Sequence, residues 1–251
     1  MRLFKETLLK LQEYALMVID IFRGLGSIGK YRQDTLLEMY WIGTKAIKLI
    51  FFGGLFVGII LAIETGHQLD AFGAKTLVGR TVALGMIREL GPVIAGLLLA
   101  ARTGAKNASE IGAMQLSEQI DAMRAFGTNA IHKLVMPRTI AAVVMFLPLT
   151  LIGDVTGFVG GMIVTKLSLN VDTSFFWHSA INTLAYKDLV AGFVKPVFFG
   201  FFISTISCYY GLTTEGGTTG LGRNTISAVV VSSATILVLD FIFAKLIWEF
   251  F

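Results

Sequence analysis

The sequence predicts an all-α integral membrane protein with five membrane-spanning helices. Of its 251 residues, 55% are hydrophobic and only 15% are charged, whereas a soluble domain of this length usually carries about 25% charged residues. The mean hydropathy is +0.73, and the apolar residues come in long blocks separated by short polar segments. The net charge of +4 is not concentrated in one basic patch, so no nucleic-acid partner is expected.

The N-terminal segment is expected to form an amphipathic helix. Its apolar residues recur at spacings of three or four, with charged residues on the other face; they are Phe4, Leu8, Leu11, Ala15, Val18, Ile19 and Phe22. Such a helix is too charged to span a bilayer and suits the membrane interface, although packing on a soluble partner is the alternative. Charges run through the first 25 residues, so no cleavable signal peptide is expected. We therefore divide the chain into an interfacial segment, 1–40, and a five-span domain, 41–251.

The stretch GLGSIGKY, residues 24–31, is similar to a phosphate-binding loop in its glycine spacing. Tyr31, however, stands where such a loop has the Ser or Thr that holds Mg²⁺, and an amphipathic helix rather than a strand precedes it. We expect a flexible break between two helices and no nucleotide site in this chain.

Five blocks are long enough to span a bilayer, which takes roughly 20 residues. They cover residues 44–64, 82–102, 139–165, 189–211 and 226–248. The first block contains Gly54 and Gly58, and the third contains Gly153, Gly157 and Gly161. Rows of small residues at this spacing let membrane helices approach one another closely.

The distribution of Lys and Arg predicts the orientation. With the N-terminus in the cytoplasm, the inner segments 1–45, 102–138 and 211–225 hold seven, five and one basic residues. The outer segments 64–81 and 166–188 and the C-terminal end hold two, two and one. Because basic residues favour the cytoplasmic side, the N-terminus is expected inside and the C-terminus outside.

The second block opens with two charges, Arg88 and Glu89, followed at once by Gly91 and Pro92. Proline has no N–H to donate and restricts the residue before it, so the second span should start or bend here. Ionisable groups inside a membrane are candidates for functional residues. The alternative is that both charges anchor the helix end at the interface by snorkelling.

Residues 107–138 form the longest polar segment after the N-terminal region. A helix over 107–126, followed by Gly127 and closed by Pro137, would form a compact cytoplasmic docking element. A plain solvated connector is the alternative.

Two stretches resemble a known family. ELGPVIAGLLLAARTGAKNASEIGAMQLSEQIDAM, residues 89–123, looks like the signature of the MlaE/YrbE permeases, the membrane subunits of ABC-type lipid transporters. GLTTEGGTTGLGRNTISAVV, residues 211–230, is similar to the loop before that family's last span. The resemblance extends from about residue 40 to the C-terminus.

The resemblance implies a transport subunit of the bacterial inner membrane, without a catalytic site or metal of its own. It implies a homodimer that moves phospholipid or a related lipid to or from a periplasmic MCE-domain protein and serves outer-membrane lipid asymmetry. A separate cytoplasmic ABC ATPase dimer would bind ATP and Mg²⁺ and supply the energy, and a small STAS-type cytoplasmic subunit would complete the assembly.

The resemblance also implies two sets of site residues. The lipid pocket, at the dimer interface, would be lined by Leu61, Leu69, Phe72, Arg88, Glu89 and Leu90. We expect Glu89 to face this pocket and Arg88 to turn towards lipid phosphates or a neighbouring carboxylate such as Glu64. The 107–126 helix would couple to the ATPase through Glu110, Glu118, Gln119, Asp121 and Met123.

Two other functions compete with this interpretation. Asp154, Asp240 and Glu89 could relay protons in a proton-coupled secondary transporter of an amphipathic solute, but five spans do not divide into two equal repeats. Asp154 and Asp240 could also form an intramembrane aspartyl protease pair, although structural pairing or placement at the interface is the interpretation we favour. His67, His132 and His178 are widely separated, so no metal site is expected.

Overall fold

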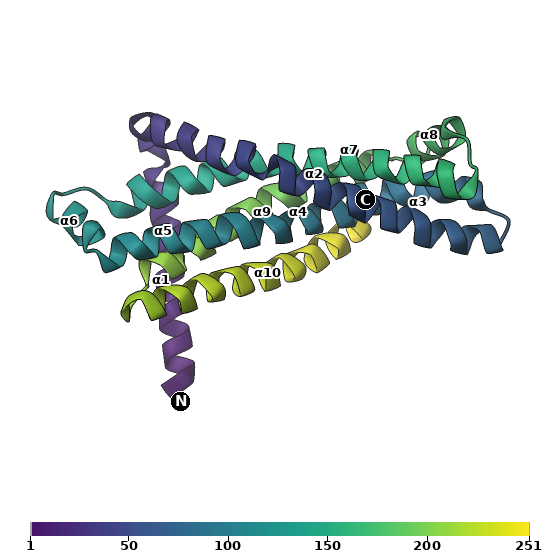
Figure 1. Cartoon of the computed structure of the whole chain (residues 1–251). Helices are drawn as coiled ribbons and strands as arrows, with labels where there is room; N and C mark the ends of the chain where they lie inside the picture. Colours follow the sequence, from purple (N-terminus) through teal and green to yellow (C-terminus); the bar gives the residue numbers. More distant parts are fainter. Residues whose placement is uncertain (1, 251) are drawn as a thin grey trace. The chain divides into compact units, whose positions relative to one another are not determined.

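The computed structural model describes residues 2–250, without the side chains of residues 2–4, 6, 7, 248 and 250 (Figure 1). Every regular element in this range is a helix, and five helical segments are long and apolar enough to cross a membrane. The predicted all-α class, the five spans and the N-terminal helix are therefore confirmed, and the protein is a multi-pass membrane protein.

The helical segments extend beyond the predicted spans at both ends. After α1 (Arg2–Gly24) and the 3₁₀ helix η1 (Leu25–Tyr31), the first span lies within α2 (Arg32–Ala71). After the short 3₁₀ helix η2 (Lys75–Leu77), the second comprises α3 (Val78–Gly85), the π-helical turn η3 (Met86–Leu90), α4 (Gly91–Leu99), a second π-helical turn, η4 (Ala100–Gly104), and α5 (Ala105–Leu116). The third comprises a π-helical turn, η5 (Ile131–Val135), and α7 (Met136–Leu169). The fourth is α9 (Tyr186–Leu212), and the fifth lies in α10 (Gly217–Phe250).

Two short helices lie between these segments. α6 (Gln119–Ala125) follows α5 after a break at Ser117 and Glu118, where Glu118 has a positive φ of 58°. The predicted 107–126 helix is therefore two helices, and its first half continues the second span. α8 (Thr173–Ile181) was not predicted, although Asp172 caps it by accepting a hydrogen bond from the main-chain N–H of Ser174. An Asp immediately before the first helical residue is a signal of such a helix start.

The chain forms two compact units, each built from three stretches. Unit 1 contains the residues up to Ile42, Ala100–Val144 and Gly200–Thr235, and unit 2 contains Gly43–Leu99, Met145–Phe199 and the residues from Ile236 onward.

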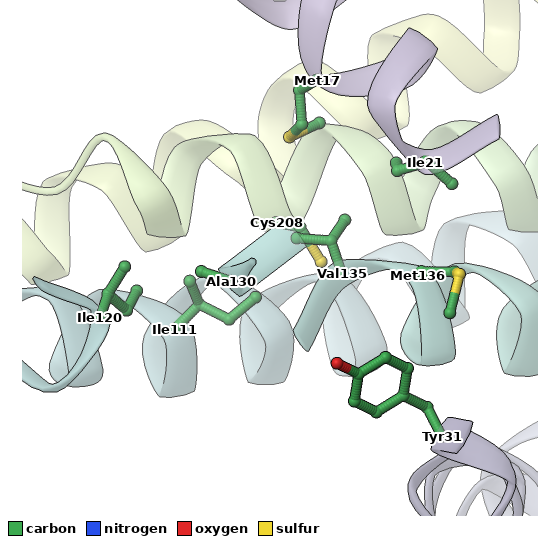
Figure 2. Close-up of a cluster of buried hydrophobic side chains, with 9 residues drawn as sticks. All are labelled: Met17, Ile21, Tyr31, Ile111, Ile120, Ala130, Val135, Met136 and Cys208. Atoms are coloured by element: carbon green, nitrogen blue, oxygen red, sulfur yellow. The ribbon is translucent and has the colours of Figure 1, made fainter. Parts of the chain in front are cut away.

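In unit 1, α1 packs on the other helices through Met17 and Ile21, which meet Cys208 of α9 and Val135 in a buried cluster (Figure 2). Tyr14 adds a hydrogen bond of 2.8 Å to Thr205. Most of the apolar residues predicted for the helix face of α1 lie outside this cluster and are exposed. Leu11, for example, is 65% exposed and Phe22 is 56% exposed. An exposed apolar face opposite the packed one agrees with a helix lying in the membrane interface.

In unit 2, the predicted glycine rows bring α2 and α7 into backbone contact. A Cβ atom added at Gly54 would collide with the carbonyl of Gly153, and one added at Gly58 would collide with the carbonyl of Gly157. Gly161 continues the row, since a Cβ atom there would lie 3.2 Å from the carbonyl oxygen of Gly58. The two rows are thus the contact surface between these helices.

Candidate functional site

Lys195 of α9 lies at the centre of a charge cluster in unit 2. Its side chain is fully buried, and its Nζ lies 2.6 Å from Oε2 of Glu89 and 2.7 Å from Oδ1 of Asp240. Nζ also donates a hydrogen bond of 2.8 Å to the main-chain carbonyl of Arg88. One ammonium group therefore joins η3, α9 and α10, and Asp240 is structurally paired, as the sequence analysis favoured.

Pro92 explains why the carbonyl of Arg88 is available to Lys195. In a regular α-helix the N–H of residue 92 would donate to the carbonyl of residue 88, but proline has no N–H. The helix accommodates Pro92 by the π-helical turn η3, after which Gly91 donates to the carbonyl of Met86. The span thus begins well before Pro92, and its departure from regular helix is this turn.

Arg88 is ion-paired with Asp188 of α9. Both Nε and Nη2 of Arg88 contact Oδ1 of Asp188, which is buried, and Oδ2 of Asp188 accepts a hydrogen bond of 2.8 Å from the N–H of Ala185. The neighbouring carboxylate that the structure shows beside Arg88 is thus Asp188; Glu64, which the sequence analysis gave as an example, is exposed on α2. Asp188 and Lys195 were missed, although each is a charge within or next to an apolar block, which is the signal that singled out Arg88 and Glu89.

The six residues of the predicted lipid pocket fall into three places in unit 2. Arg88 and Glu89 line a small hollow together with Lys187, Asp188, Ala191, Ala244 and Ile247. Leu61, Leu69 and Leu90 pack against a buried cluster that includes Val82, Met86 and Phe176. Phe72 is 84% exposed just beyond the end of α2. A pocket formed by these residues between two copies of the chain stays a prediction.

Asp154 of α7 has different contacts from the residues of the charge cluster. It is only 6% exposed, and its Oδ1 makes no hydrogen bond within the described part of the chain. A Cβ atom at Gly91 would collide with this oxygen, so glycine provides the space that the carboxyl group occupies. Asp240 is held by Lys195 instead. These different surroundings argue against a pair of catalytic aspartates.

The predicted coupling residues lie on α5 and α6 in unit 1. Glu118, Gln119 and Asp121 are exposed, whereas Met123 is half-buried and packs against the cluster of Figure 2. Asp121 forms an ion pair of 3.1 Å with Arg124 on the same helix. The exposed three are therefore available to a partner, and Met123 serves the folding of the unit itself.

Glu110, the fifth predicted coupling residue, belongs to an ion-pair network. Arg138, which is buried, lies 2.8 Å from Glu110 and 3.2 Å from Glu38. Lys106 lies 2.9 Å from Glu38 and 3.3 Å from Glu110. Three of these ion pairs thus connect α2, α5 and α7, and the fourth, between Lys106 and Glu110, lies within α5.

Among the residues that the structure describes, no group of three His, Cys, Asp or Glu side chains could hold a metal ion. The polar contacts that the structure shows in the site are hydrogen bonds and ion pairs between Arg88, Glu89, Asp188, Lys195 and Asp240.

Comparison with known proteins shows the family to which the chain belongs. The family described as Permease MlaE matches residues 35–246. A probable ABC transporter permease protein of Rickettsia typhi is 36% identical over 248 residues, which cover 98% of this chain and 96% of its own. The intermembrane phospholipid transport system permease protein MlaE of Haemophilus influenzae is 30% identical over 246 residues, covering 92% of this chain and 94% of its own. Protein TRIGALACTOSYLDIACYLGLYCEROL 1 of Arabidopsis thaliana chloroplasts is 33% identical over 217 residues, covering 86% and 62% respectively. With a match over most of its length and relatives of this similarity, the chain belongs to the MlaE permease family.

Proposed function

We propose that this protein is the membrane-embedded permease of an ABC transporter that moves phospholipid, or a related lipid, between a bacterial inner membrane and a periplasmic MCE-domain protein. Support comes from the relative in Haemophilus influenzae, whose name describes an intermembrane phospholipid transport system. The orientation proposed from the Lys and Arg counts places the N-terminus in the cytoplasm and the C-terminus in the periplasm.

The structural observation that carries the proposal is the position of Glu89. Its side chain is 43% exposed although one carboxylate oxygen lies 2.6 Å from the buried Lys195. The protein thus fixes the carboxylate from one side and leaves the other side open. In a bundle of apolar helices, such a group can meet the polar head of a lipid without being left unpaired when the lipid departs.

The proposed assembly contains two copies of this chain, an ABC ATPase dimer that binds ATP and Mg²⁺, the MCE-domain protein and a STAS-type subunit. The exposed surface of α6 supports an ATPase contact, because Glu118, Gln119 and Asp121 are free of the packing that holds Met123. The chain itself needs no hydrolytic site if the ATPase supplies the energy.

Purification of the tagged protein from its own membranes tests the assembly. We expect native mass spectrometry to find two copies of the chain with an ATPase and an MCE-domain protein, and lipid analysis to find co-purified phospholipid. Glu89→Gln, which removes the charge but can still accept a hydrogen bond from Lys195, should reduce the bound phospholipid while the assembly remains; Glu249→Gln, the same change at an exposed position of α10, should leave it unaltered. Recovery of a lone monomer without ATPase would favour the proton-coupled secondary transporter instead.

A further inference from the structure

A second hollow in unit 2 is lined by none of the residues of the charge cluster. It is a cavity of about 480 Å³ between η3 and the helices α7, α8 and α9, within the range of about 300–1,000 Å³ typical of small-molecule sites. Its lining is apolar or aromatic apart from Asp154 and includes Ile87, Val155, Phe158, Trp177 and Phe193. Val155 is 61% exposed and Trp177 is 49% exposed, so the cavity opens on the surface of the unit.

The surroundings of this opening determine what can occupy it. α7 and α9 are membrane-spanning segments, so an opening on their exposed apolar side chains faces lipid. Water is a poor occupant because apolar cavities stay dry. A vacant cavity would also lose the dispersion contacts that its lining could make. A hydrocarbon chain is apolar like the lining and would supply these dispersion contacts.

The cavity is distinct from the predicted lipid pocket but adjoins the same turn. None of the six predicted pocket residues lines it. Met86 and Ile87 of η3 do, and the next two residues, Arg88 and Glu89, belong to the charge cluster. Asp154 forms part of the wall and lies against Gly91, directly after η3. A chain in the cavity therefore contacts the turn that positions the charges.

We propose that this cavity binds one hydrocarbon chain of a membrane phospholipid, as a site separate from the pocket predicted between two copies. The site rests on the membrane-spanning helices of a single chain, and it does not depend on which lipid the transporter moves.

Photolabelling of the full-length protein in lipid nanodiscs tests the proposal. The probe is a phosphatidylethanolamine with a diazirine in one acyl chain, and labelled residues are located by mass spectrometry. We expect labels to concentrate on Val155, Trp177 and Phe193 and to be lost there in Val155→Trp, which fills the cavity. Ile163→Trp, the same kind of change at a position of α7 that is 51% exposed and outside the cavity, should leave labelling unchanged.

Val159→Trp, at another lining position that is 39% exposed, gives the same test if Val155→Trp does not fold. Labels spread evenly over the exposed apolar residues of α7 and α9, or unaffected by either tryptophan, would overturn the proposal. So would labelling by a diazirine fatty acid but not by the phospholipid. The experiment uses no ATP and no partner, so its failure is distinguishable from a failure of the transport function.

Discussion

A fully buried ammonium group is tolerated among apolar helices only when anionic and carbonyl oxygens surround it. Lys195 has three such partners, the carboxylates of Glu89 and Asp240 and the main-chain carbonyl of Arg88. The third partner is available because Pro92 cannot donate to it. Arg88, Glu89 and Pro92, which stand together in the sequence, therefore all contribute to the surroundings of Lys195.

Replacing Lys195 by Met should strongly destabilise the protein. The change leaves Glu89 and Asp240 without their shared cation, and removing one partner of a buried ion pair costs about 3–5 kcal/mol. Denaturant unfolding in detergent would measure the loss. Lys245→Met is the matched control on α10, because the Lys245 side chain is 65% exposed and its ion pair with Glu249 contributes little. Equal stability of the two variants would show that the cluster does not hold unit 2 together.

Sequence reasoning singled out Arg88, Glu89 and Asp240 of this cluster but not Asp188 or Lys195. Arg88 and Glu89 could be singled out because charges are rare inside apolar blocks. The same signal marks Asp188 and Lys195, but their pairing with Arg88 and Glu89 could not be predicted. They lie about 100 residues away, and helical periodicity carries no information on which spans are neighbours.

At the scale of elements, small residues set how closely two helices approach. The rows Gly54–Gly58 and Gly153–Gly157 could be predicted, because a repeat of four places residues on one helix face. That the two rows pack against each other could be seen only in the structure, where Gly54 and Gly58 of α2 each meet a carbonyl of α7.

Gly58→Val should destabilise the contact between α2 and α7. A side chain at residue 58 collides with the backbone of Gly157, which cannot move aside as a flexible side chain could. Overpacking usually costs about 1–3 kcal/mol, and we expect a loss near the upper end, measured by thermal unfolding in detergent. Gly222→Val is the control, because no atom lies within 4 Å of a Cβ at this exposed position of α10. A variant at residue 58 as stable as the control would contradict the close packing.

The helix boundaries were harder to predict than the helices themselves. The break at Ser117 and Glu118 has no Gly or Pro to mark it, and Glu118 adopts a left-handed conformation that side chains other than Gly and Asn rarely take. The π-helical turns likewise have no composition signal apart from Pro92.

α6 offers a direct test of the proposed ATPase contact. Glu118→Lys reverses a charge on an exposed residue, so it should weaken co-purification of the ATPase without unfolding unit 1. Met123→Lys would also disturb the cluster of Figure 2 and so cannot separate the two effects. Lys5→Glu reverses a charge at an exposed position of α1 and should leave ATPase recovery unchanged. Undiminished recovery with Glu118→Lys would exclude this residue from the contact.

For the molecule as a whole, the family places the chain among ABC transporter permeases, and the structure shows how its charges are held inside apolar helices. The central claim is that Glu89, fixed by Lys195 and open on its other side, takes part in moving a phospholipid that a separate ATPase drives. Composition could predict the membrane class and the resemblance could predict the family, but the fixing of Glu89 by Lys195 became visible only in three dimensions.

The most direct measurement is lipid movement by the purified assembly in proteoliposomes that contain a fluorescent phospholipid. We predict movement that requires ATP, that is strongly reduced in Glu89→Gln with the assembly intact, and that Glu249→Gln leaves at the unmodified protein's rate. Phospholipid movement by Glu89→Gln at the unmodified protein's rate, or movement driven by a proton gradient without ATP, would contradict the account.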